Sequence, residues 1–427
     1  MTQPLLGAIS RPHVDWFALS PSLAMLCASG LLLLVAVLVP RRARKPVAAA
    51  GAAAGFVAAF VFAVVLAAKS PHGATAVADS IFRDRWSAVA QVLIAGCGVV
   101  AVLLSWGERW REEHVSEYFA LLTAAGAGMA FFVQASNLMT LFLGLEWFSV
   151  SLYVLCAIDI DLVGSLEAGL KYLIVGAVGS ATLLFGSALV YGSTGQLSFD
   201  RIASAGHTHD SLLVLGLAMV IAGLAFKTSA APFHMWTPDA YTGAPTPVTA
   251  FMSSATKVAA LVVAYRLLVT AFPGEEHLWT WAVAGIVCAS LAVGNIAALV
   301  QRNVKRLLAY SSVSHAGFML IAVAAANPPG ARALLYYLIP YCAMSLGAFG
   351  GYLDRRDDAV VALQALLWGV ALVLLLVSCE VRSSAIHGAP PLAASSLVAC
   401  LGIFAIKAVV AAAPYARRLV ALRPAKP

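Results

Sequence analysis

Charged side chains are scarce in this sequence. Asp, Glu, Lys and Arg together make up 11% of its 427 residues, whereas 61% are hydrophobic. Soluble globular chains carry about 25% charged residues. Several apolar runs reach the roughly 20 residues that a helix needs to cross the hydrocarbon core of a bilayer. The composition therefore excludes a soluble globular protein and predicts an all-α polytopic membrane protein.

Grouped metal ligands are also missing. The seven cysteines lie in or beside apolar runs, and no two form a CxxC pair. They are typical of small core residues, which excludes an iron–sulfur cluster or a zinc site. Haem would need facing axial ligands, yet only His234 and His315 lie in or near the predicted core. We therefore expect no cofactor and no metal in this chain.

The apolar runs predict about thirteen transmembrane spans. These are residues 18–40, 47–67, 87–106, 117–136, 137–158, 165–192, 211–231, 247–271, 278–300, 303–326, 331–353, 360–379 and 391–414. Residues 1–17 lack a basic n-region, so the first span is expected to serve as its own insertion signal.

Basic residues cluster in short loops, which indicates membrane orientation and not nucleic-acid binding. The RRARK segment, residues 41–45, directly follows the first span and is expected to be a cytoplasmic loop. Alternation then places most other Lys and Arg on the same side and the N-terminus outside. Arg266, near the outer end of its span, is expected to snorkel to the interface.

One stretch, residues 222–257, combines charges with proline. An apolar helix carrying Lys227 is followed by Pro232, and a second helix carries Lys257. Proline should break the first helix near Ala231. Broken membrane helices beside ionisable groups commonly line ion pathways, because the freed backbone groups must face protein or water. The stretch predicts an ion-translocating subunit that moves protons.

Ionisable side chains inside the predicted spans are the candidate proton relay. They are Glu146, Lys171, Lys227, Lys257, His315 and Lys407. All except Lys171, which lies nearer the cytoplasmic end, fall at a similar depth. Burial and a nearby carboxylate act in opposite directions on the proton affinity of a lysine. Movement of Glu146 relative to Lys227 would therefore switch that lysine between holding and releasing a proton.

Each of these residues also has a structural interpretation. Glu146 and Lys227 could form a static ion pair that orders two helices. Lys257 could snorkel or pair with a helix end. A helix-packing role stays open for Lys171 and His315.

Three long stretches resemble the antiporter-like membrane subunits of respiratory complex I, the NADH:quinone oxidoreductase, and most closely their subunit N family. The stretches are LFLGLEWFSVSLYVL with the following helix, FKTSAAPFHMWTPDAYTGAPTPVTAFMSSATKVAAL, and NVKRLLAYSSVSHAGFMLI. The resemblance implies an antiporter-like fold of about 13–14 transmembrane helices, with inverted repeats and a broken helix in each. Residues 1–110 would hold three N-terminal helices, 111–271 the first half-channel repeat, and 272–427 the second repeat, divergent or truncated after about residue 351.

The resemblance also implies roles for the charged residues. Glu146 and Lys227 would be the modulating pair of the first half-channel, Lys257 the next relay group, and His315 part of the central axis. Lys171 matches a family lysine on the helix after the glutamate helix. The family's second broken helix has no clear counterpart after LGAFGGYLDRRDD, and Lys407 is its candidate lysine at a different spacing.

The implied function is proton translocation by a membrane-arm subunit, coupled to electron transfer from NADH to quinone elsewhere in the complex. NADH, FMN, iron–sulfur clusters and quinone would belong to other subunits. The expected partners are the other membrane subunits, through them the peripheral arm, and the lipid bilayer, with no nucleic acid. The expected location is the bacterial inner membrane. Two alternatives stay open: a subunit of a multi-subunit cation/proton antiporter, and a structural membrane-arm subunit with an incomplete channel.

Overall fold

The computed structural model describes residues 14–70, 73–77, 79–108, 113–205 and 210–353, which all belong to one compact unit. Lys407 and the last two predicted spans lie outside these residues.

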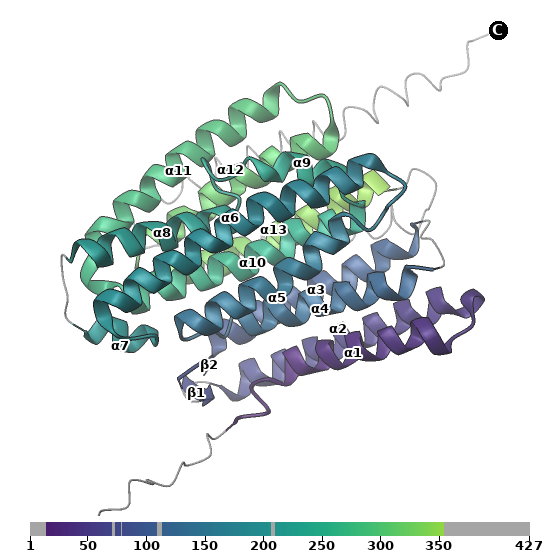
Figure 1. The fold of residues 1–427 in the computed structure, drawn as a ribbon, viewed down its shortest axis with the longest axis horizontal. Coiled ribbons are helices and arrows are strands. Elements are labelled where there is room, and N and C mark those ends of the chain that lie inside the picture. Colours follow the sequence, from purple (N-terminus) through teal and green to yellow (C-terminus); the bar gives the residue numbers. More distant parts are fainter. Residues whose placement is uncertain (1–13, 71–72, 78, 109–112, 206–209, 354–427) are drawn as a thin grey trace, which may run out of the picture. The chain divides into compact units, whose positions relative to one another are not determined.

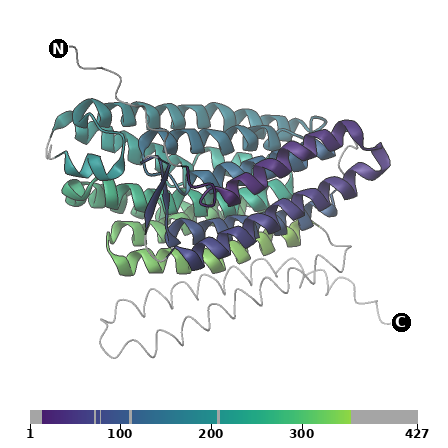
Figure 2. The ribbon, with the colours of Figure 1, turned by 90° about the horizontal axis from the view of Figure 1, so that it is seen from below.

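Long apolar helices run side by side through this unit (Figures 1 and 2). Ten helices of the described part are long and apolar enough to cross a membrane. They are α1 (Ser20–Leu38), α2 (Arg41–Lys69), α3 (Arg85–Trp106), α4 (Val115–Phe132), α5 (Leu138–Cys156), α6 (Val163–Thr194), α10 (Thr246–Ala271), α11 (Glu276–Leu299), α12 (Val304–Ala324) and α13 (Pro328–Leu353). A shorter apolar helix, α8 (Ser211–Lys227), joins them. Each of the first eleven predicted spans thus corresponds to a helix, and the all-α polytopic class is confirmed.

Helix α10 is the central helix of this unit. It packs against α3, α12 and α13, among others, and 94% of its most apolar window is buried. The corresponding values for α6 and α11 are 33% and 22%, because these helices expose one apolar face. A helix that is apolar on every side belongs in a core. Lys257, near the middle of α10, is therefore surrounded by protein.

The break after α8 begins earlier than the sequence analysis predicted. Helix α8 ends at Lys227, four residues before Ala231, and the chain re-enters a helix at α9 (Trp236–Gly243). Pro232 explains the shift, because proline has no N–H for the carbonyl four residues earlier and its ring clashes there. That carbonyl belongs to Thr228. Ser229 then turns the chain away with a φ of 59°.

Glycines bring α6 and α8 into close contact. A Cβ atom on Gly186 would lie 2.8 Å from the backbone oxygen of Gly216, and one on Gly216 would lie 2.9 Å from the oxygen of Gly186. Small residues allow such approach in a bilayer, where the hydrophobic effect does not drive helix packing. The contact fixes the position of Lys227 at the end of α8 relative to α6.

We expect Gly186→Ala to destabilise the protein by about 1–3 kcal/mol, because the added methyl group overpacks a backbone contact. Gly285→Ala is the matched control, since a Cβ atom there meets nothing within 4 Å. Alanine in that open helical position should be neutral or stabilising by up to about 1 kcal/mol. Thermal denaturation in detergent measures both variants. Equal midpoints would contradict the packing argument.

The RRARK segment is not a loop, which corrects the sequence analysis. Arg41–Lys45 form the first turns of α2, and only Val39 and Pro40 separate it from α1. Two of the basic side chains donate hydrogen bonds to carbonyls near helix ends. Arg44 Nε donates to the carbonyl of Val39 at 2.9 Å, and Lys45 Nζ donates to the carbonyl of Glu108 at 3.0 Å. Basic side chains often satisfy the last carbonyls of a helix in this way.

A short β-hairpin, which the sequence analysis did not predict, joins α2 to α3. Its strands are β1 (Ala74–Val77) and β2 (Ile81–Arg83), and it lies at the same end of the bundle as α7 (Phe199–Ser204) (Figure 1). Arg83 forms an ion pair with Asp15 at 2.9 Å. Burial raises the pKa of Asp15, but hydrogen bonds from Arg83 and backbone amides outweigh it and hold the pKa below its usual value. The carboxylate thus ties the segment before α1 to the hairpin.

Candidate functional site

Lys227 occupies a buried pocket of hydroxyl and aromatic groups at the break. Only 2% of the residue is exposed. Its Nζ atom donates to Ser149 Oγ on α5 at 2.7 Å and to the Tyr172 hydroxyl on α6 at 3.3 Å. It also lies 4.4 Å from the centroid of the Phe148 ring. Burying an ammonium group costs free energy unless such groups replace its hydrating water. The hydroxyl and aromatic groups around Lys227 therefore stabilise its charged form.

Glu146 lies one helical turn before Ser149 on α5. Side chains spaced in this way are neighbours about 5–6 Å apart at Cβ. The Glu146 Oε1 atom is buried without a hydrogen-bond partner, and no ion pair among the described residues joins Glu146 to Lys227. The structure therefore places the two residues near each other without the static ion pair. A carboxylate oxygen left in this state is free to accept a donor.

Lys257 lies on the other side of the break. It is fully buried, and its Nζ atom donates to the backbone carbonyl of Thr228, the residue that follows α8. Pro232 has no N–H that could donate a hydrogen bond to this carbonyl, so the lysine supplies the missing donor. The negative end of a helix dipole also favours a cation at this position. Pairing with a helix end therefore fits Lys257, whereas snorkelling does not.

His315 lies in the interior of α12 with 2% exposure. Its Nδ1 atom is 2.7 Å from the Tyr337 hydroxyl of α13. The centroid of its ring is 5.3 Å from that of Tyr341, one turn further along the same helix. The histidine thus faces two tyrosines.

Lys171 belongs to a different environment. Its side chain is 43% exposed and forms ion pairs with Glu167 at 2.7 Å and with Asp239 of α9 at 2.8 Å. Asp239 also pairs with Arg306 of α12 at 2.8 Å. Consecutive residues of a helix do not share a face, and Tyr172 is the residue that contacts Lys227. Lys171 therefore ties α6 to α9 and α12, outside the buried pocket.

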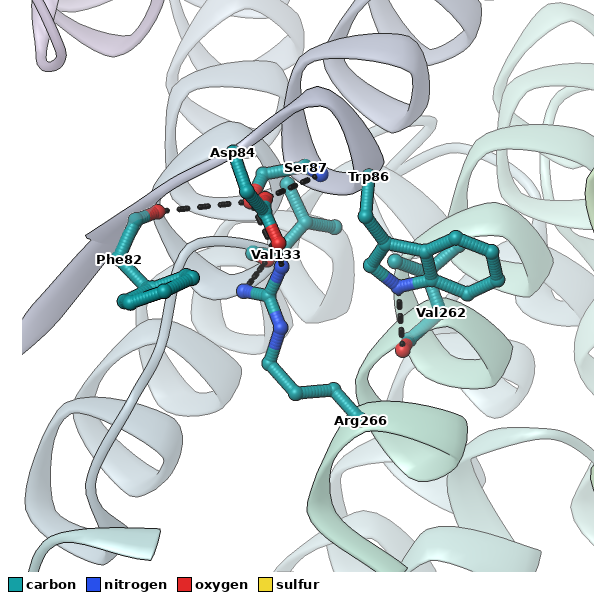
Figure 3. Close-up of polar contacts among 7 residues, drawn as sticks. All are labelled: Phe82, Asp84, Trp86, Ser87, Val133, Val262 and Arg266. Atoms are coloured by element: carbon teal, nitrogen blue, oxygen red, sulfur yellow. Dashed lines mark hydrogen bonds and ion pairs between the residues drawn. The ribbon is translucent and has the colours of Figure 1, made fainter. Parts of the chain in front are cut away.

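Arg266 is buried, which corrects the expectation that it snorkels. Its guanidinium forms an ion pair with Asp84 at 2.5 Å and donates to Ser87 Oγ and to the Val133 carbonyl, both at 2.9 Å (Figure 3). Asp84 is the N-cap of α3, and Val133 ends α4. The arginine finds its partners at two helix ends, so it does not need the interface. This cluster fixes the C-terminal part of α10, the helix that carries Lys257.

The sequence analysis missed the hydroxyl groups around the lysines and the histidine. Ser149 and Tyr172 contact Lys227, and Tyr337 contacts His315. Serine and tyrosine occur throughout apolar membrane helices, where they most often serve packing or bond to their own backbone. Their positions could be recognised only once the helices were placed.

The protein-family model described as "NADH:quinone oxidoreductase/Mrp antiporter, TM" matches residues 135–415, more than half of the chain. The chain belongs to this family. The antiporter-like fold expected from the resemblance is confirmed, and the matched range includes every candidate relay residue.

Curated relatives carry the name NADH-quinone oxidoreductase subunit N. The protein of Azorhizobium caulinodans is 44% identical over 306 residues, which cover 71% of this chain and 64% of that protein. The protein of Methylobacterium nodulans is 46% identical over 263 residues, covering 61% of this chain and 55% of that protein. This chain thus spans less than two thirds of the length of these relatives.

Solved structures share the fold. A chain of respiratory complex I from Thermus thermophilus is 28% identical, with a TM-score of 0.67, and the match covers 92% of this chain and 88% of that one. A chain of the Mrp complex from Dietzia sp. DQ12-45-1b is 22% identical, with a TM-score of 0.67 and coverage of 79% and 64%. The second likeness concerns the fold alone.

Proposed function

We propose that this protein is a proton-translocating membrane-arm subunit of NADH:quinone oxidoreductase in a bacterial inner membrane. Proton movement would be coupled to electron transfer from NADH to quinone elsewhere in the complex. The observation that carries the proposal is the pair of buried lysines, Lys227 and Lys257, on the two sides of the α8 break. The names of the curated relatives and the match to complex I support it.

Protons would pass from one buried group to the next. When the Glu146 carboxylate approaches Lys227, it stabilises the protonated amine, and when it withdraws, the amine releases a proton. Lys257 is the next acceptor, because its amine bonds to Thr228, the neighbour of Lys227 in the chain. His315 would follow as a group that exchanges protons near neutral pH. Only protons move in these steps, so the chain needs no redox group.

The division of the chain follows the same proposal. Residues 1–110 would hold three N-terminal transmembrane helices. Residues 111–271 would form the first half-channel, and residues 272–427 would form the second, with Lys407 as its candidate lysine. Lys171 would hold α9 in place through Asp239. NADH, FMN, the iron–sulfur clusters and quinone would belong to other subunits. The partners would be the other membrane subunits and, through them, the peripheral arm.

A second candidate is a subunit of a multi-subunit cation/proton antiporter. The family description names the Mrp antiporter, and the fold similarity to the Dietzia chain is in keeping with this alternative. Sodium or potassium exchange that needs neither NADH nor quinone would favour it. A purely structural membrane-arm subunit is the third reading.

Affinity purification of the tagged chain from gently solubilised native membranes tests the assignment. We expect it to recover the other membrane subunits and the peripheral arm, with NADH:quinone activity. Recovery of antiporter subunits would contradict the proposal and support the second candidate. Recovery of the chain alone would also overturn the assignment to complex I.

A further inference from the structure

The hydroxyl group of Tyr241 on α9 is buried without a hydrogen-bond partner. The residue is 0% exposed, and its ring packs edge-on against Trp236 at 6.1 Å between centroids. The hydroxyls of Ser229 and Ser312 interact with it, but neither has the distance and angle of a formed hydrogen bond. Phenylalanine would satisfy the packing equally well. An unpaired buried hydroxyl is costly, so its presence calls for a role beyond packing.

Ser312 begins a chain of bonded hydroxyls. Its Oγ atom is 2.9 Å from the Tyr341 hydroxyl, which in turn donates to the backbone carbonyl of Ser253 at 3.0 Å. Ser253 lies one turn before Lys257 on α10, and Ser312 lies one turn before His315 on α12. Tyr341 of α13 thus connects α10, which carries the buried lysine, with α12, which carries the histidine.

Tyr241 and Tyr341, at the two ends of this row of hydroxyls, lie near the bond of Lys257 and near His315, respectively. Ser229, beside Tyr241, directly follows Thr228, whose carbonyl binds Lys257. At the other end, the Tyr341 ring lies 5.3 Å from the His315 ring. All three hydroxyl-bearing residues are buried: Tyr241 at 0%, Tyr341 at 1% and Ser312 at 3% exposure.

We propose that Tyr241, Ser312 and Tyr341 form a hydroxyl relay that carries protons between Lys257 and His315. The inference rests on the function proposed above and names residues that the charged positions alone do not reveal. The row of hydroxyls lies among the helices that carry these two ionisable groups.

Each step of the relay moves only protons. A hydroxyl oxygen accepts one proton on a lone pair and gives up the proton that it already carries, so no charge accumulates and no oxidant or reductant takes part. Hydroxyl hydrogens rotate to suit their partners. The Tyr341 hydrogen turns from the Ser253 carbonyl towards its next acceptor, and Tyr241, which has no fixed partner, bonds intermittently with its neighbours, directly or through a water.

Tyr241→Phe and Tyr341→Phe test the relay in the assembled complex. Each variant keeps the aromatic ring and removes the hydroxyl. We expect NADH-driven proton transport in sealed membrane vesicles to fall at least about tenfold, since a positioned proton-transfer group contributes about 10²–10⁴-fold and water replaces it only in part. Tyr118→Phe is the matched control, because it also breaks a buried pair of tyrosine and serine hydroxyls, 2.6 Å apart at Ser105. It should leave transport unchanged.

Thermal denaturation separates folding from transport. Removing the unpartnered Tyr241 hydroxyl should leave the midpoint unchanged or higher, whereas Tyr118→Phe should lower it. A stable Tyr241→Phe complex that transports protons at the normal rate would overturn the relay.

Lys257→Ala distinguishes the relay from the function on which it rests. If this variant loses transport while both tyrosine variants keep it, the relay is wrong and the proposed function stands. If the Lys257→Ala variant transports protons normally, the proposed function is contradicted, because it assigns Lys257 to the proton path.

Discussion

Replacing Lys227 with alanine is expected to lower NADH-driven proton transport by about 10²-fold or more, while the subunit stays in its complex. Lys227 is buried at the break, and its ammonium is held by Ser149 and Tyr172. A positioned proton-transfer group contributes about 10²–10⁴-fold to a rate. Proton uptake in sealed vesicles and recovery of the purified complex measure the two quantities separately.

Lys227→Arg distinguishes relay from structure. Arginine keeps the positive charge and the hydrogen bonds but does not release its proton in proteins. A static role would therefore survive this substitution, whereas a relay would not. Lys45→Ala is the control, because Lys45 bonds to a helix end far along the sequence from the break. Normal transport by either Lys227 variant would refute its assigned role.

Arg266→Ala is expected to produce the largest loss of stability in the described part of the chain, about 3–5 kcal/mol. Removing one partner of a buried ion pair leaves the other charge uncompensated. Asp84 would lose the guanidinium at 2.5 Å, and the carbonyl of Val133 would lose its donor. Thermal denaturation of the purified complex or chain in detergent measures the effect.

Arg201→Ala is the matched control for Arg266. Arg201 pairs with Asp79 at 2.6 Å, but its side chain is 64% exposed. An exposed pair contributes at most about 1 kcal/mol. Replacing Asp84 together with Arg266 should recover part of the loss, because the uncompensated charge is then removed as well. A loss for Arg266→Ala no larger than for Arg201→Ala would show that the cluster in Figure 3 adds nothing to stability.

The long helices could be predicted because the hydropathy of a span is summed over roughly 20 residues and tolerates local errors. The end of α8 depends on a single proline. The sequence predicts the break near Ala231, next to Pro232, whereas the effect of the proline falls on the carbonyl four residues earlier. The contact of Arg266 with Asp84 joins positions 182 apart in the sequence. No local pattern in the sequence indicates such a pair, and the sequence alone therefore predicts that Arg266 lies at the interface.

The candidate site, too, has features that could be predicted from the sequence and features that could not. The burial of Lys227 and Lys257 could be predicted because each lies within a long apolar run. Lys171 lies in such a run too, but it faces Asp239 at the edge of the bundle, and the face of a helix is poorly defined when nearly every residue is apolar. Partners of Lys227 such as Tyr172 depend on how α6 and α8 meet, which the sequence does not specify locally.

The bond between Lys257 and Thr228 has a consequence for how transport and movement are connected. Elsewhere in a helix, a carbonyl binds a peptide N–H, a donor that never ionises, whereas here it binds an amine that can give up its proton. Bonds from a charged donor are roughly twice as strong as those from a neutral one. The occupancy of one proton and the conformation of the main chain are therefore thermodynamically linked at a single oxygen atom, and each biases the other by the same free energy.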